Sequence, residues 1–222
     1  MVRALLVVMI AARVAAADPP QLDSPYAVVL DADTGAELFA HDADTVRPIA
    51  SMTKLFVAMT LRKHRLDLSR WTTIDYDDAV ASVGGAPTRL LEGQTFQNRD
   101  LMYAMMLSSD NRVPSALARS VGMSKRDLLD RMRVVVKDLG LAHTTFVDST
   151  GIAGNESTAR EMALALREAL RDAVLRRYMT TRYARVISQT EEITADYKST
   201  VSPLWNPHYK IRGGKTGWTE AA

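Results

Sequence analysis

The segment from Ser51 to Leu61, SMTKLFVAMTL, restricts the fold of this chain more than any other. Drawn as a helix, it carries apolar side chains on nearly every side. A helix with so narrow a polar face has to be enclosed by other elements. The sequence therefore predicts a buried central helix with the rest of the domain packed around it.

Strands are predicted at both ends of the chain. In SPYAVVLDADTGAELFAHD they cover Tyr26–Leu30 and Glu37–His41, with an Asp-Thr-Gly turn between them. In SPLWNPHYKIRGGKTG an extended segment is predicted over His208–Lys215. We expect the first and last of these elements to share one antiparallel sheet. The fold class indicated is α+β, a sheet with flanking helices and a helical lobe.

Three helical stretches are predicted in the middle of the chain. RDLMYAMMLSS has leucine and methionine at helical spacing. The helix in SKRDLLDRMRVVVKDLG begins at the N-cap Ser124, with Asp127 three residues on, and stops at Gly140. STAREMALALREALRDAVLRRYM opens with a Thr158–Glu161 capping box. Its apolar face is predicted at Met162, Leu166, Leu170 and Val174. The methionine-rich faces indicate core packing rather than a cofactor site.

The N-terminus, MVRALLVVMIAARVAAAD, has the layout of a secretory signal peptide over residues 1–17. Arg3 precedes an apolar run, and three alanines follow it. The run is shorter than the roughly 20 residues of a membrane-spanning helix, so no transmembrane segment is expected. Residues 18–222 are then one exported domain, periplasmic or secreted.

Composition argues against several classes of partner. Removing Arg3 and Arg13 from the 28 basic residues leaves 26, equal to the 26 acidic residues, so nothing points to nucleic acid or anionic lipid. There is no cysteine for disulfides or thiolate metal sites, and the four histidines show no ligand spacing. The acidic stretch 31–42 fits a calcium loop poorly, because Ala36 stands where that loop needs glycine. These residues therefore indicate no metal site.

A serine and a lysine lie one turn apart at the start of the predicted buried helix. Positions three apart share a helix face, so Ser51 and Lys54 are predicted neighbours. A serine hydroxyl becomes a nucleophile when a base takes its proton, and burial beside a second cation can turn lysine into that base. The helix N-terminus could hold an oxyanion. Taken alone, a capping serine and a surface lysine would be the simpler interpretation.

The triplet Ser109-Asp110-Asn111 falls between two helical stretches, in MMLSSDNRVPSALA. A hydroxyl and a carboxamide two residues apart on a loop can face one cleft. Ser109 could then pass a proton to a leaving amine, and Asn111 could bind a substrate amide. Helix capping is the other use of these residue types, and it stays open.

The triplet Lys215-Thr216-Gly217 ends the extended segment. A cation and a hydroxyl can bind a carboxylate, and glycine allows a peptide to approach the backbone closely. A basic surface turn is the alternative for this triplet alone.

The three motifs in this order resemble the serine D-alanyl-D-alanine peptidases, or penicillin-binding proteins, and the related serine β-lactamases. Their signature is Ser-x-x-Lys, Ser-x-Asn and Lys-Thr-Gly. VRPIASMTKL, DSTGIAGNESTARE and GGKTGWT are similar to the low-molecular-mass branch, and the resemblance runs from about Tyr26 to the end. TTRY and NPHYKI favour the D-alanyl-D-alanine endopeptidases over the carboxypeptidases.

This resemblance implies a role for each motif residue. Ser51 would attack the carbonyl between two D-alanyl-type residues and form an acyl-enzyme, with Lys54 as proton acceptor. Ser109 would pass the proton to the leaving amine, and Asn111 would orient the substrate. The remaining implied substrate-binding residues are Lys215, Thr216, Gly217 and Trp218. The backbone N–H groups of Ser51 and Trp218 would form the oxyanion hole. Peptidoglycan peptides and β-lactams are the implied ligands, with no cofactor.

Two alternatives stay open. Ser-Asp-Asn also matches class A β-lactamases, but HTTFVDSTGIAGNES lacks the E-x-x-x-N pattern used there for deacylation, so penicillin is expected to stay on Ser51. In the family, further strands follow Lys-Thr-Gly, so we expect the sequence to be C-terminally truncated. A non-catalytic remnant that at most binds cell-wall peptides is therefore the other alternative. No G-x-S-x-G elbow is present, which disfavours a Ser-His-Asp hydrolase.

Overall fold

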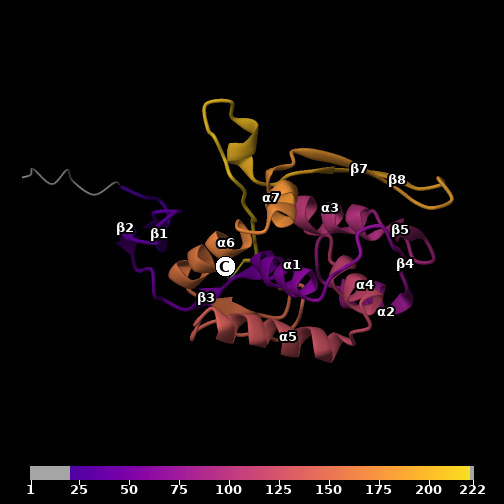
Figure 1. Ribbon diagram of the computed structural model, residues 1–222, viewed down its shortest axis with the longest axis horizontal. Helices are drawn as coiled ribbons and strands as arrows, with labels where there is room; N and C mark the ends of the chain where they lie inside the picture. Colours follow the sequence, from indigo (N-terminus) through magenta and orange to yellow (C-terminus); the bar gives the residue numbers. More distant parts are fainter. Residues whose placement is uncertain (1–20, 221–222) are drawn as a thin grey trace, which may run out of the picture.

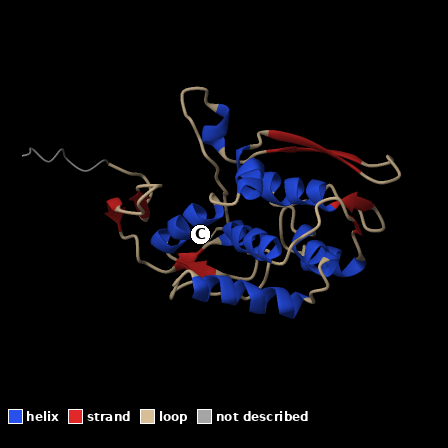
Figure 2. Ribbon diagram, in the orientation of Figure 1, coloured by secondary structure: helices blue, strands red, loops and turns tan. Residues whose placement is uncertain are grey.

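The computed structural model describes residues 21–220, so the predicted signal peptide over 1–17 lies outside the described part. Helices gather in one body, and short antiparallel strand pairs lie around its edge (Figures 1 and 2). The arrangement is α+β, as the sequence predicted. Within residues 21–220, no helix is both long and apolar enough to cross a membrane.

The helices surround one buried helix, as predicted. They are α1 (Thr53–Lys63), α2 (Tyr76–Ala81), α3 (Asn98–Ser108), α4 (Val113–Ser120), α5 (Lys125–Asp138), α6 (Ala159–Ala169) and α7 (Ala173–Thr180). Every residue of α1 from Thr53 to Leu61 is buried, and α3, α4, α5 and α6 all contact this helix. A 3-10 turn, η1 (Ala50–Met52), leads into α1 and carries Ser51. A second 3-10 turn, η2 (Ser202–Trp205), lies near the C-terminal end.

The predicted ends of α5 are confirmed. The Asp127 backbone N–H donates to Ser124 Oγ at 3.1 Å, and the Ser124 N–H donates to the Asp127 carboxylate at 3.0 Å. Gly140 follows the helix with φ of 69°, the left-handed conformation that ends many helices. The side chains of Leu128, Met132 and Val135 are buried.

The helix predicted from Thr158 onward is two helices, α6 and α7. Asp172 ends the run, because its carboxylate accepts the first backbone N–H groups of α7 and so caps a new helix. The same carboxylate accepts from Arg62 at 2.8 Å. Apolar residues keep their four-residue spacing across the break, so the pattern did not reveal it.

Only half of the predicted capping box at the start of α6 forms. Thr158 Oγ1 accepts the Glu161 backbone N–H at 3.1 Å. The Glu161 carboxylate instead accepts from the His143 backbone N–H at 2.9 Å and from the Thr144 hydroxyl at 2.6 Å. These bonds tie α6 to residues 143 and 144, which precede the strand β6 (Glu156–Ser157).

Among residues 21–220 the strands form four two-stranded antiparallel sheets. The pairs are β1 (Ala27–Leu30) with β2 (Glu37–His41), β3 (Arg47–Pro48) with β6 (Glu156–Ser157), β4 (Trp71–Thr73) with β5 (Thr95–Gln97), and β7 (Tyr183–Ile187) with β8 (Thr194–Lys198). The N-terminal strand pair is therefore the predicted hairpin.

The expectation that the first and last elements share a sheet is wrong for the described residues. β1 pairs with β2 alone, and residues 207–217 contain no strand. A ladder needs a second backbone about 4.8 Å away that supplies donors and acceptors. No described strand pairs with this segment, so side-chain and glycine contacts hold it instead.

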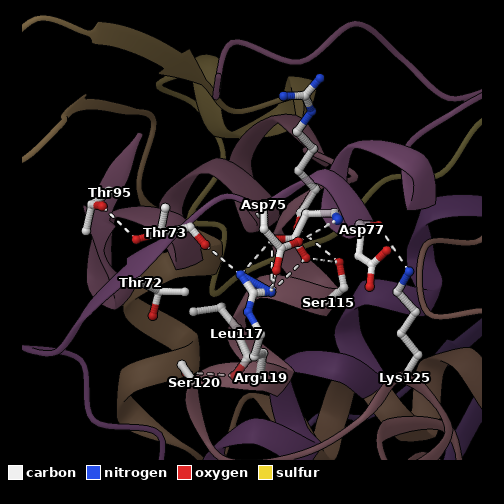
Figure 3. A network of polar contacts seen from close by, with 12 residues as sticks. Thr72, Thr73, Asp75, Asp77, Thr95, Ser115, Leu117, Arg119, Ser120 and Lys125 are labelled. Atoms are coloured by element: carbon white, nitrogen blue, oxygen red, sulfur yellow. Dashed lines mark hydrogen bonds and ion pairs between the residues drawn. The ribbon is translucent and has the colours of Figure 1, made fainter. Parts of the chain in front are cut away.

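A buried ionic network ties α2 to α4 and β4 (Figure 3). The Asp78 side chain is fully buried and accepts from the Ser115 hydroxyl at 2.6 Å and from Arg119 at 2.9 Å. Arg119 also donates to the Thr73 carbonyl at 2.6 Å and lies 3.0 Å from the Asp75 carboxylate. The network fixes α2, and the segment that follows α2 leads to the candidate site.

Candidate active site

Ser51 lies in the 3-10 turn before α1, and this turn begins in an unusual conformation. Ala50 has φ of 47°, which residues with a side chain rarely adopt. Gly151 packs directly on it, since a Cβ at Gly151 would lie 1.9 Å from the Ala50 carbonyl oxygen. The Thr53 hydroxyl donates to the same oxygen at 2.8 Å. The turn is thus held from two sides, with Ser51 partly exposed at the N-terminus of α1.

Lys54 is fully buried, and its Nζ has three oxygen neighbours. It lies 3.0 Å from Ser51 Oγ, 2.6 Å from Asn111 Oδ1 and 2.7 Å from the Thr150 carbonyl oxygen. The neighbourhood of Ser51 and Lys54 inferred from their spacing is therefore present. The other two partners come from segments 57 and 96 residues further along the chain.

The surroundings of Lys54 suit a base. Burial lowers the pKa of Lys54 to about 7, although two nearby carboxylates act in the opposite direction. A neutral amine has two N–H donors and one lone pair. The oxygens of Asn111 and Thr150 can only accept, so they take the two N–H groups. The lone pair is then left for the hydroxyl proton of Ser51.

The Ser109–Asn111 turn faces both lysines of the site. Ser109 ends α3 with φ of 60°, and its hydroxyl is in hydrogen-bond contact with Lys215 Nζ. Gly85 approaches the Asn111 amide so closely that a Cβ would lie 2.1 Å from Asn111 Nδ2. The structure therefore brings the second predicted motif to the first.

Lys215 is partly buried and joins the third motif to the second through its contact with Ser109. Its Nζ also donates to the Thr216 carbonyl oxygen at 2.8 Å. Burial first, and the positive charge of Lys54 second, lower the pKa of Lys215 to about 7. The positive charge of Lys54 thus disfavours the protonated form of Lys215.

Gly217 packs on the turn that carries Ser51. A Cβ at Gly217 would lie 2.7 Å from the Ile49 carbonyl oxygen and 3.1 Å from the Met52 nitrogen. The Thr216 hydroxyl contacts the hydroxyl of Thr200, which follows β8. Trp218 follows Gly217, and its side chain is exposed. Its backbone N–H is therefore next in the chain to the glycine that contacts the Ser51 turn.

A loop that sequence reasoning did not assign to the site completes it. The Asp148 carboxylate accepts backbone N–H groups from Thr150 at 2.9 Å, Gly151 at 2.6 Å and Ala153 at 2.9 Å. Burial alone would raise the pKa of Asp148, but these donors outweigh it and hold the pKa below its usual value. The loop so formed places the Thr150 carbonyl on Lys54. The turn chemistry of Asp-Ser-Thr-Gly could have indicated a tight loop, but not its partner.

Metal-binding side chains do not gather around the reactive groups. Within the described residues, no three or more His, Asp or Glu side chains are arranged to hold a metal ion. The charged neighbours of Lys54 are Asp110 and Asp148 on the negative side and Lys215 on the positive side. The four histidines take no part in the contacts of Ser51, Lys54, Ser109 or Lys215 described above.

The chain is similar to proteins of a known family. Residues 13–222 match the family described as D-alanyl-D-alanine carboxypeptidase. A D-alanyl-D-alanine endopeptidase of Escherichia coli is 28% identical over 207 residues, which are 93% of this chain and 66% of that protein. One of Pseudomonas aeruginosa is 29% identical over 231 residues, covering all of this chain and 74% of that protein. The chain thus spans about two thirds to three quarters of the length of these relatives.

Solved structures give the same fold. The crystal structure of a Streptomyces DD-transpeptidase has a TM-score of 0.83 and 26% identity, covering 91% of this chain and 83% of that one. A D-alanyl-D-alanine carboxypeptidase from Mycobacterium tuberculosis has a TM-score of 0.83 at 23% identity, covering 94% and 78%. From the family match over residues 13–222, the chain belongs to the D-alanyl-D-alanine carboxypeptidase family of serine peptidases.

Proposed function

We propose that this protein is a serine-type D-alanyl-D-alanine peptidase that acts on peptidoglycan stem peptides and is acylated by penicillins at Ser51. The observation that carries the proposal is the placement of Lys54 Nζ, 3.0 Å from Ser51 Oγ and fully buried. Two acceptors hold its N–H groups, so its lone pair is directed at the hydroxyl.

In the acylation step, Ser51 Oγ forms a bond to the carbonyl carbon and its proton moves to neutral Lys54. The oxyanion that forms lies at the N-terminus of α1, where the backbone N–H of Ser51 and that of Trp218 would stabilise it. When the C–N bond breaks, the leaving amine takes a proton. Ser109, in contact with Lys215, would deliver it and would take up in return the proton that Lys54 received, which makes Lys54 neutral again. Water then cleaves the ester and restores the Ser51 hydroxyl.

Substrate recognition falls to the remaining motif residues. Asn111 would hold the substrate amide, while Lys215 and Thr216 would bind a carboxylate. Both relatives described above are named endopeptidases, which favours cleavage between cross-linked stems over removal of a terminal residue. A substrate in the cell wall agrees with the predicted signal peptide and with a periplasmic or secreted location.

The test is acylation of the purified chain by a fluorescent penicillin. We expect a stable covalent label on the wild-type protein, and at least a 100-fold weaker label on Ser51→Ala, because no other group replaces the nucleophile. Matching circular dichroism spectra of the two proteins serve as the folding control. A folded wild-type protein that takes no label would overturn the peptidase proposal and favour a chain that only binds cell-wall peptides. Rapid release of hydrolysed penicillin would instead indicate a β-lactamase.

A further inference from the structure

The middle residue of the Ser109–Asn111 turn, Asp110, bonds to groups other than the two lysines. The Asp110 side chain is buried, with 6% of its surface exposed. While its two neighbours contact the lysines, the Asp110 carboxylate accepts hydrogen bonds from other segments. A buried carboxylate is costly unless donors surround it, so its partners indicate why it is there.

Three donors from three segments meet at Asp110. The Thr88 hydroxyl donates at 2.6 Å, the Tyr197 hydroxyl at 3.1 Å and the Arg112 backbone N–H at 3.1 Å. Thr88 belongs to the segment after α2, Tyr197 to β8 and Arg112 to the start of α4. This single carboxylate therefore joins elements that are distant in the chain.

The segments that meet at Asp110 also touch the reactive groups. The segment after α2 carries Gly85, which packs on the Asn111 amide. Three residues after Tyr197 comes Thr200, whose hydroxyl contacts that of Thr216. The segment after α2 begins at the end of α2, and α2 itself is fixed by the network of Asp78 and Arg119 (Figure 3). Asp110 therefore bonds both to the segment that packs on the second motif and to β8, which leads to the residue that contacts the third motif.

We propose that Asp110 is a positioning residue that fixes the Ser109–Asn111 turn against β8 and the segment after α2, and that its negative charge acts on Lys54. This inference rests on the proposed function only for its activity readout. The hydrogen bonds set where Asn111 holds Lys54, and the charge favours the protonated amine. The two contributions can be separated by variants.

The charge contribution has a definite direction. Asp110 directly precedes Asn111, whose Oδ1 lies 2.6 Å from Lys54 Nζ, so the carboxylate belongs to the turn that holds the amine. Asp148 and Asp110 both raise the pKa of Lys54 against the larger effect of burial. Lys215 is the cation that interacts with Lys54. Near Asp110, the Arg89 guanidinium lies over the ring of Tyr197, 5.5 Å from the ring centroid. Removing the charge of Asp110 should therefore lower the pKa of Lys54, so the amine becomes a base at lower pH.

The experiment compares Asp110→Asn, Tyr197→Phe and a control, Asp138→Asn, which removes an exposed charge paired with Lys63. The rate constant for acylation by fluorescent penicillin is measured from pH 5 to 9. For Asp110→Asn we expect the midpoint of the acid limb to fall by at least half a pH unit. The ratio of the rate at pH 6 to the plateau rate then rises about threefold, since the neutral fraction of an amine near pKa 7 changes by that factor.

For Tyr197→Phe we expect the midpoint to stay in place and the plateau rate to fall about three- to tenfold, because a positioning bond is lost without a charge. Asp138→Asn should match the wild type in both. An unchanged midpoint in Asp110→Asn overturns the charge contribution, and an unchanged plateau in Tyr197→Phe overturns the tether. If Asp110→Asn does not fold, Asp110→Ser keeps an acceptor for Arg112 and tests the same midpoint.

A second readout needs no activity. The Lys54 side chain can be titrated by NMR in wild-type and Asp110→Asn proteins carrying ¹³C-labelled lysine. The midpoint should again fall by at least half a unit in the variant, and equal midpoints overturn the inference. A wild-type protein that is not acylated would contradict the proposed function, while the NMR titration would still decide the role of Asp110.

Discussion

At the scale of single residues, the position of Ser51 depends on the absence of a Cβ atom at Gly151. Gly151 has φ of 88°, and a Cβ there would lie 1.9 Å from the Ala50 carbonyl oxygen. Backbone oxygen cannot move aside as a flexible side chain could. The bare Cα of Gly151 therefore allows the loop from Asp148 to press on the turn that carries the nucleophile.

We predict that Gly151→Ala lowers the rate of acylation by penicillin about 100-fold, since displacing a reacting group by about 1 Å costs a factor of this order. Gly154→Ala is the matched control, because Gly154 has the same φ of 88° but no atom within 4 Å of its Cβ position. Both variants should lose about 1 kcal/mol of stability from backbone strain. Equal acylation rates in the two variants would show that the contact does not position Ser51.

At the scale of elements, α2 is a short helix fixed by charge rather than by apolar area. Of its six residues only Asp78 is buried. Its carboxylate is held by Ser115, Arg119 and the backbone N–H of Asp75. Because α2 leads into the segment that carries Gly85 and Thr88, this ionic anchor supports the second motif from behind.

We predict that Asp78→Ala lowers the free energy of unfolding by about 2–3 kcal/mol, because it removes the buried acceptor that Ser115 and a partly exposed Arg119 share. Asp77→Ala should change it by less than about 0.5 kcal/mol, since the Asp77 side chain is exposed. Urea unfolding followed by circular dichroism measures both. A similar loss in the two variants would mean that the buried network adds no particular stability.

At the scale of the whole molecule, burying the Lys54 amine in the site lowers the free energy of unfolding. Lys54 has its ordinary pKa, 10.5, when the chain is unfolded and a pKa of about 7 when it is folded. Between these values the unfolded chain binds more protons than the folded one. The burial of Lys54 therefore costs no stability above pH 10.5, where the amine is neutral in both states. The cost grows, and stability is lost, as the pH falls from 10.5 toward 7.

We predict that the free energy of unfolding of the wild type rises relative to that of Lys54→Met by about 1 kcal/mol per pH unit between pH 7.5 and 9.5. Methionine fills a similar volume without a titrating group. Urea unfolding of both proteins at several pH values gives this difference. Parallel curves would show that the pKa of Lys54 is not depressed by folding.

Much of this architecture could be predicted from short stretches of sequence. The buried α1, the Ser124 cap, the Gly140 stop and the N-terminal strand pair were all predicted, and the structure confirms them. The proximity of Ser51 and Lys54 followed from helical spacing. These features depend on hydrogen bonds and side-chain contacts among residues a few positions apart, which a linear pattern records directly.

The errors arose where another segment competes for the same groups. Asp172 ended a helix that the apolar spacing continued, and Glu161 left its capping box for His143 and Thr144. The shared sheet is absent from the described residues: β1 pairs with β2 alone, and no described strand pairs with residues 207–217. Local propensity describes what a segment can do, and neighbours in space choose among those options.

By itself the sequence determined the reactive groups of this protein: two serine hydroxyls, two amines and a carboxamide in three motifs. Only the tertiary structure decided how they work together. It directed Asn111 and Thr150 at Lys54 and buried Lys54 enough to lower its pKa to about 7. Burial and contacts between distant segments depend on how the whole chain packs, because desolvation arises from every atom that excludes water.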